Sequence, residues 1–223
     1  MPLKSRRIAL RGILFDWDGT LLDSFEADMR AYEAMFRALE IAWTRRELAR
    51  HYSPDWYRVY KAAGIPRDRW DEADKLWRRA YRREKPKLLP GVKAIVGSLR
   101  RNYQLGLVTS GDRKRVRRQM RLFGFAETFG ACVCSEDAAH RKPHPAPLRL
   151  AMSRMDLDPT SCVYVGDAPE DVEMARRANV RVIGVAGPFP TARRMRAERP
   201  DAVIDSIEAL PDVLAGLSAG VAD

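Results

Sequence analysis

The chain has 223 residues, of which 46% are hydrophobic, and its formal net charge at pH 7 is +10. This length allows one good-sized domain or a domain with a small insert, and the apolar content excludes wholesale disorder. No segment approaches the roughly 20 consecutive apolar residues that a membrane span requires.

Continuous apolar runs alternate with helical patterns along most of the chain. Buried strands are expected at Ile8–Phe15, Gln104–Thr109, Ala131–Cys134, Cys162–Val165, Arg181–Ala186 and Val203–Ile204. Helices are expected between them at Val92–Arg101, Lys114–Phe123, Ala146–Met155, Glu170–Ala178 and Ile207–Leu217. This alternation predicts an α/β fold, a Rossmann-like parallel sheet with helices on both faces.

Residues 23–85 interrupt the alternation with an all-helical segment. Helical patterns there cover Ala27–Leu39, Arg45–Tyr52, Trp56–Ala63 and Trp70–Lys85. The segment contains four of the five tryptophans, which we expect to build a small core of its own. Asp23-Ser24 at its start and Pro86 and Pro90-Gly91 after its end suit a hinge. We therefore predict a helical insert, residues 23–85, in a core made of residues 1–22 and 86–223.

The N-terminal segment and the cysteine count favour a cytoplasmic protein with no membrane partner. Arg11 and Asp16 cut short the apolar run near the N-terminus, and no small-residue cleavage site of a signal peptide follows. Three cysteines are an odd and low number, which does not suggest a disulfide framework.

The basic charge raises nucleic-acid binding as a hypothesis. The densest basic patch covers residues 113–121. Val116, Met120 and Phe123 in and beside it follow the spacing of one helix face, so the pattern favours an amphipathic helix with a solvated basic face. Basic charge also attracts anionic small molecules, and we favour such a partner over nucleic acid.

Polar residues follow four of the predicted strands at the point where each one ends. These residues are Asp16 and Asp18 after the first strand, Thr109 and Ser110 after the second, Lys142 after the third, and Asp167 and Asp171 after the fourth. Ligands of open parallel sheets bind outside the carboxyl ends of the strands. Two aspartates separated by one residue repel each other, and a bound cation is the simplest way to neutralise them.

The motifs D-x-D-G-T, T-S-G, K-P-x-P and G-D-x-x-x-D, in this order, resemble those of the haloacid dehalogenase-like hydrolases. The resemblance covers the chain from Ile13 to about Leu210 and extends to the phosphatases with a small helical cap, such as the phosphoglycolate phosphatases. It implies a Mg²⁺-dependent phosphatase that hydrolyses a small phosphate monoester through an aspartyl-phosphate. Asp18 and Asp167 argue against the dehalogenases themselves, which need no metal.

The resemblance also implies roles for the four aspartates. Asp16 would be the nucleophile, and Asp18 would be the general acid and then the general base. Mg²⁺ would contact Asp16, Asp167 and the backbone carbonyl of Asp18. Asp171, one helical turn beyond Asp167, would act through water.

Two groups of residues are expected to bind the substrate. Lys142, the Thr109 hydroxyl and the Ser110 amide would hold the phosphoryl group and stabilise its charge, which makes Lys142 and Thr109 catalytic candidates as well. The leaving group would be recognised by the helical cap. The candidate specificity residues there are Arg50, His51 and Tyr52.

Two alternatives remain open from the sequence. The first is a sugar phosphomutase of the β-phosphoglucomutase type, although its first motif usually ends in valine, where this chain has Thr20, and Pro54 stands where the mutase arginine would be. The second is a nucleic-acid-binding protein with a vestigial hydrolase core. The identity of the phosphate ester stays open, and both a monomer and a dimer are compatible with the sequence.

Overall fold

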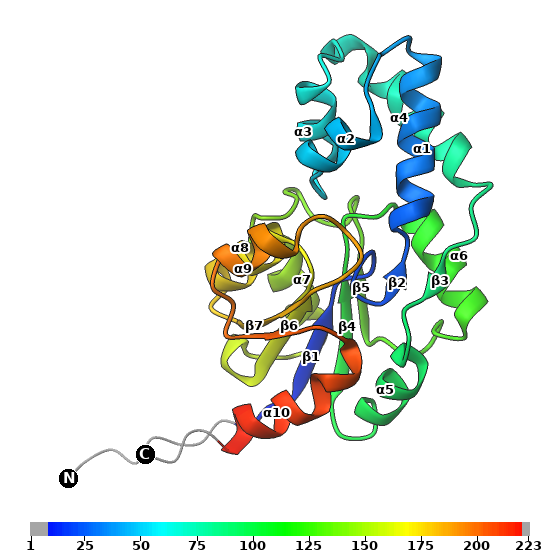
Figure 1. Ribbon diagram of the computed structural model, residues 1–223. Helices are drawn as coiled ribbons and strands as arrows, with labels where there is room; N and C mark the ends of the chain where they lie inside the picture. Colours follow the sequence, from blue (N-terminus) through cyan, green and yellow to red (C-terminus); the bar gives the residue numbers. More distant parts are fainter. Residues whose placement is uncertain (1–8, 220–223) are drawn as a thin grey trace.

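A six-stranded parallel sheet forms the centre of the computed structural model, which describes residues 9–219 (Figure 1). The strands lie in the order β5-β4-β1-β6-β7-β8. Their bounds are β1 Gly12–Phe15, β4 Gln104–Val108, β5 Ala131–Val133, β6 Cys162–Gly166, β7 Arg181–Val185 and β8 Ala202–Ile204. All six predicted strands are present, although β1 begins only at Gly12, and the predicted start at Ile8 lies outside the described residues.

Helices cover both faces of this sheet, which confirms the predicted fold class (Figure 1). One face is covered by α5 (Val92–Leu99), α6 (Arg113–Phe123) and α10 (Leu210–Ala219), and the other by α7 (Ala146–Arg154), α8 (Pro169–Arg177) and α9 (Ala192–Ala197). Side chains of β1 alternate between the two layers: Ile13 and Phe15 pack on the first and Leu14 on the second. All three are fully buried, and each such side chain contributes about 1.5–3 kcal/mol to folding.

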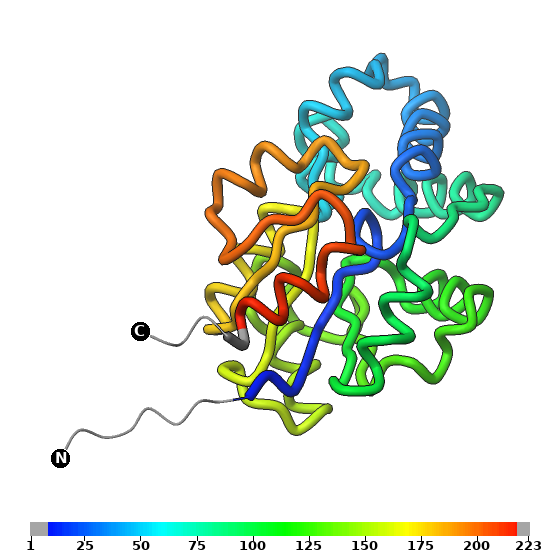
Figure 2. The backbone as a smooth tube through the Cα atoms, turned by 60° about the horizontal axis from the view of Figure 1, so that its bottom comes forward, coloured from blue at the N-terminus to red at the C-terminus, as the bar shows by residue number. Residues whose placement is uncertain are grey.

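Four helices lie between the first and second strands of the sheet, at the end where its strands terminate. They are α1 (Phe25–Ala38), α2 (Arg45–His51), α3 (Trp56–Ala62) and α4 (Trp70–Tyr81). Both views show this blue-to-cyan segment outside the sheet, at one end of the molecule (Figures 1 and 2). Its own apolar cluster includes Met29, Met35, Phe36 and Val59, all at least 98% buried.

The chain enters and leaves this helical segment at one place. The two-residue strand β2 (Leu22–Asp23) pairs antiparallel with β3 (Lys87–Leu88). The pairing ties together the two connections that the sequence predicts as a hinge. Short 3₁₀ helices at Arg67–Arg69, Pro159–Ser161 and Ile207–Ala209 complete the described elements. None of the helices between residues 9 and 219 is both long and apolar enough to cross a lipid bilayer.

Candidate active site

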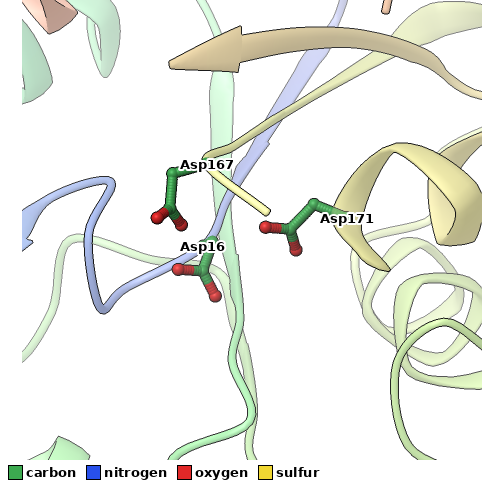
Figure 3. Close-up of side chains that lie close together, drawn as sticks. All are labelled: Asp16, Asp167 and Asp171. Atoms are coloured by element: carbon green, nitrogen blue, oxygen red, sulfur yellow. The ribbon is translucent and has the colours of Figure 1, made fainter. Parts of the chain in front are cut away.

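Three carboxylates converge at the carboxyl edge of the sheet (Figure 3). Asp16 directly follows β1, Asp167 directly follows the neighbouring strand β6, and Asp171 lies in the first turn of α8. Each offers one oxygen atom, and these atoms lie within 4.8 Å of one another. All three residues are buried, so their mutual repulsion is poorly screened by water and requires nearby cations.

Lys142 supplies one of these cations. Its ammonium nitrogen lies 2.6 Å from Oδ1 of Asp16 and 2.7 Å from Oδ1 of Asp171, and it also donates to the hydroxyl of Tyr164. Burial lowers the pKa of Lys142, but its ion pairs with Asp16 and Asp171 outweigh this effect and raise the pKa above its usual value. Lys142 is therefore a permanent positive charge, but one ammonium cannot neutralise three carboxylates.

The three carboxylates of the cluster carry more negative charge than Lys142 can neutralise. Burial raises the pKa of Asp16 to about 7, with Asp171 and Asp18 adding to the rise and Lys142 opposing it. Burial also raises the pKa of Asp167 well above its usual value, and Asp16 and Asp171 add to this effect. A set of buried carboxylate oxygens that lacks a counter-charge fits a hard divalent cation such as Mg²⁺.

Glycine at position 19 allows the first motif to approach Asp167. Gly19 has a φ of +87°, which glycine adopts without strain, and a Cβ atom there would lie 2.4 Å from Oδ2 of Asp167. The hydroxyls of Thr20 and Thr191 point to the two oxygens of the same carboxylate, each at 3.4 Å. These contacts orient Asp167 toward Asp16.

Asp18 is held by an arginine from the basic stretch whose pattern predicts a solvated face. Arg115 donates to both oxygens of Asp18, at 2.9 and 2.7 Å, and its guanidinium stacks over the ring of Tyr81. Burial acts to raise the pKa of Asp18, but Arg115 outweighs this and lowers it. Most of the basic face of α6 is exposed as predicted, whereas only 10% of the Arg115 side chain is. The signal in the sequence was its four-residue spacing from Gln119, which places both side chains beside the apolar stripe.

Thr109 and Ser110 lie between the end of β4 and the start of α6. Thr109 is buried, and its hydroxyl oxygen accepts a hydrogen bond from the amide of Gly111 at 3.0 Å. Asp112 caps α6 by accepting from the amide of Arg115. The donors of this turn therefore lie at a helix N-terminus, which favours anions.

These groups line one wall of a cleft that encloses about 850 Å³, open solvent included. The wall from the sheet consists of Asp16, Asp18, Thr109, Ser110, Asp167 and Asp171. The opposite wall comes from the helical segment and is rich in aromatic side chains, namely Tyr32, Tyr52, Trp56, Tyr60, Trp77 and Tyr81. Lys142 lies behind the wall from the sheet, where it forms ion pairs with Asp16 and Asp171. A cleft of this size between two parts of a chain suits a small-molecule ligand.

Of the three predicted specificity residues, the structure brings only Tyr52 to the cleft. Its ring stacks on Phe189 of the core with 4.8 Å between the ring centroids. Arg50 and His51 lie in the last turn of α2, are exposed and do not line the cleft. The helix continues to His51, so the chain turns inward only at its C-cap, Tyr52, and residues 50 and 51 stay on the solvent side.

Comparisons with known proteins agree with this geometry. The profile of the haloacid dehalogenase-like hydrolase family matches residues 13–185. A pyrophosphatase of Bacillus velezensis is 30% identical over 203 residues, which cover 89% of this chain and 93% of that protein. A plasmid-encoded phosphoglycolate phosphatase of Cupriavidus necator is 33% identical over 216 residues, which cover 91% and 92% of the two chains.

A solved structure shares the whole architecture. A haloacid dehalogenase-like family protein from Streptococcus pneumoniae superposes with a TM-score of 0.80 over 92% of this chain and 98% of its own. At 21% identity, this likeness establishes the fold. The family profile and the two phosphatase relatives extend the conclusion to the type of enzyme. The chain belongs to the haloacid dehalogenase-like hydrolase family and is a phosphatase.

Proposed function

We propose that the enzyme is a Mg²⁺-dependent phosphatase that hydrolyses a small phosphate monoester through an aspartyl-phosphate on Asp16. The observation that carries this proposal is the buried cluster of Asp16, Asp167 and Asp171, whose charge Lys142 neutralises only in part. We further propose that residues 23–85 act as a cap over a catalytic core formed by residues 1–22 and 86–223. The aromatic wall opposite the carboxylates supports this division of labour.

In this proposal Asp16 attacks the phosphorus atom. Lys142 holds the carboxylate through Oδ1, so Oδ2 is the oxygen that would form the bond. A carboxylate nucleophile divides a difficult hydrolysis into two steps, transfer to Asp16 and attack of water on the aspartyl-phosphate. Position at the end of a central strand keeps the nucleophile fixed for both steps.

Asp18 would exchange the proton in each step. Arg115 holds Asp18 ionised, which suits its role as the base that activates water in the second step. In the first step Asp18 must be protonated to donate to the leaving oxygen, so it must give up its two bonds to Arg115. Arg115 would thus be a positioning residue, in addition to the residues that the sequence motifs predict.

Some residues of the site would bind the cation, and others would bind the phosphoryl group. Asp16, Asp167 and the backbone carbonyl of Asp18 would hold Mg²⁺, which when bound supplies positive charge between carboxylate and phosphate. Asp171 would act through water, because its two oxygens already accept from Lys142 and from the amide of Ala168. The phosphoryl oxygens would be bound by Lys142, Thr109 and Ser110.

The test of the proposed function is release of inorganic phosphate from a panel of small phosphate esters, with Mg²⁺ and with excess EDTA. A phosphomutase would instead isomerise a sugar phosphate without net release of phosphate. It would also need a site for a second phosphate, yet the only cations among the described residues that line the cleft are Arg78 and Arg115, and Arg115 is paired with Asp18. Binding of nucleic acid that weakens steeply with salt, without turnover of any ester, would favour the other alternative, a nucleic-acid-binding protein with a vestigial hydrolase core.

We propose the cytoplasm as the compartment and a small phosphorylated metabolite as the partner. Cys132, Cys134 and Cys162 all carry free thiols, which suits a reducing environment. A size measurement in solution would decide between a monomer and a dimer.

Asp167→Ala is expected to raise the Mg²⁺ concentration that half-saturates activity by about tenfold or more, because it removes a ligand of a hard cation. Activity of both proteins is measured over a Mg²⁺ titration, and EDTA should silence the wild type. Asp74→Asn is the control, since Asp74 lines the same cleft on the cap side. Full wild-type activity in excess chelator would contradict the metal assignment.

Substitutions in the cap test where specificity lies. We expect Tyr52→Leu to change the ranking of esters by kcat/KM, because Tyr52 lines the cleft. The combined variant Arg50→Ala and His51→Ala tests the two residues outside the cleft, whose role in specificity stays a prediction. The measurement compares kcat/KM for p-nitrophenyl phosphate with that for a preferred ester. An unchanged ranking in all variants would place specificity elsewhere.

A further inference from the structure

The cap side of the cleft carries a buried carboxylate without an ionic partner. Asp28, in the first turn of α1, is 8% exposed and lines the cleft. It accepts a hydrogen bond from the indole nitrogen of Trp77 at 3.0 Å, and the hydroxyl of Tyr52 is near enough to lower the pKa of the carboxyl group. None of the ion pairs between described residues includes Asp28. The neutral indole therefore orients this carboxylate without neutralising it.

Several aromatic rings line the cleft together with Asp28. Besides Trp77 and Tyr52, these are the rings of Tyr32 and Tyr60. Tyr32 and Trp77 contact each other edge to face, with 6.2 Å between the ring centroids. Burial raises the pKa of Asp28 to about 7, and the negative charge of Asp18 adds to this rise. An ionised carboxylate in such surroundings is costly unless a cation accompanies it.

The other acid on the cap side, Asp74, has an ionic partner. Asp74 accepts from the hydroxyl of Tyr60 at 2.9 Å and lies 3.7 Å from the guanidinium of Arg78. Arg115, the other cation of the cleft, is paired with Asp18. Asp28 is thus the cap carboxylate of the cleft without an ion pair among the described residues: Arg115 is near enough to lower its pKa, but the guanidinium is bound to Asp18.

We propose that the substrate is a phosphate ester whose leaving group carries an organic ammonium ion, bound between the carboxylate of Asp28 and the rings of Tyr32 and Trp77. Aromatic faces attract such cations through their quadrupole, and a carboxylate completes the charge balance. A leaving group with a carboxylate or a second phosphate would meet Asp28 as a like charge. This inference rests on the proposed phosphatase function and assigns the substrate class of the same cleft.

Two esters of the same shape test the charge directly. Phosphocholine and 3,3-dimethylbutyl phosphate differ only in a quaternary nitrogen in place of a carbon atom. We expect kcat/KM of the wild type to favour phosphocholine by at least about tenfold, within the range of a desolvated cation–π contact. Asp28→Asn keeps the shape and an acceptor for Trp77 but removes the charge, and should lower the ratio severalfold, while the unchanged rings retain part of the preference. Asp74→Asn is the matched control and should leave the ratio as in the wild type.

Hydrolysis of p-nitrophenyl phosphate separates this inference from the proposed function. If the enzyme hydrolyses that ester but does not prefer phosphocholine over 3,3-dimethylbutyl phosphate, this result would overturn the inference and leave the phosphatase assignment in place. Loss of the preference in Asp74→Asn as much as in Asp28→Asn would also overturn it.

Binding provides a second measurement that does not depend on activity. The indole N–H of Trp77 donates to Asp28, so its ¹H–¹⁵N resonance reports on that carboxylate. If no ester is hydrolysed, the proposed function fails, and titrations with choline and with 3,3-dimethylbutanol still decide the inference. A shift of this resonance with choline alone, lost in Asp28→Asn, would support it. An equal response to both compounds would contradict it.

Discussion

Asp16→Asn is expected to lower kcat by about four orders of magnitude or more, because an amide cannot attack phosphorus and the loss of a required nucleophile removes the first chemical step. The comparison is phosphate release from the preferred ester and from p-nitrophenyl phosphate at saturating Mg²⁺. Both esters should lose activity equally, since the nucleophile acts on the phosphoryl group they share. A folded variant with unchanged kcat would remove Asp16 from the mechanism.

The same substitution is expected to change the pH dependence of stability in the metal-free protein. The pKa of Asp16 is raised to about 7 in the folded state, above its usual value near 4. Between these values the folded protein retains a proton that the unfolded chain has released, so this group lowers the free energy of unfolding as pH rises from about 4 to about 7. Asparagine does not titrate. The stability of Asp16→Asn relative to the wild type should therefore increase over this range, as measured by urea denaturation in EDTA.

Much of the fold could be predicted because the sheet is buried on both sides. Continuous apolar runs such as Cys162–Val165 are characteristic of a parallel strand, and all six were identified. The short helix α9, Ala192–Ala197, was missed because Met195 is its only large apolar residue and the only one that is fully buried. The strands β2 and β3 were missed because two residues are too few to show a period.

The core half of the site could also be anticipated. Parallel strands end at one edge, so residues that follow β1, β4 and β6 had to lie close together. Asp171 joins them from the first turn of α8, where its carboxylate accepts from the amide of Ala168, although the helix begins only at Pro169 and does not include Asp167. The structure brings Asp16, Asp167 and Asp171 within reach of one ion, although it does not test their roles.

The cap half could not be anticipated, because it depends on tertiary packing. Asp28 lies four and seven residues before Tyr32 and Met35, which places it on the apolar face of α1, but this spacing does not show what the carboxylate would contact. Only the packing of α1 against α4 places Trp77 on Asp28 and turns both toward the core. On α6, the charge pattern of the basic stretch does not distinguish Arg115, and only its four-residue spacing from Gln119 indicates an inward position.

Lys142→Met is expected to lower the free energy of unfolding by about 3–5 kcal/mol, because it removes the shared cation of a buried ion cluster and leaves its carboxylates unpaired. Asp16 and Asp171 both depend on the ammonium, and so does the hydroxyl of Tyr164. Methionine has a similar length and apolar volume, so the effect reports the charge and not a cavity. Urea denaturation in EDTA at pH 8 measures it, and an unchanged slope against urea would show that both proteins unfold to the same extent.

The double variant Asp16→Asn with Lys142→Met distinguishes lost charge from lost packing. Removing one of the orphaned carboxylates should recover part of the stability lost in Lys142→Met, because fewer uncompensated charges then remain buried. Damage to packing would instead persist in the double variant. Saturating Mg²⁺ should also stabilise Lys142→Met more than the wild type, since the added cation meets a larger excess of negative charge there. Activity should recover in neither case, because the ammonium is also expected to bind the phosphoryl oxygens in the transition state.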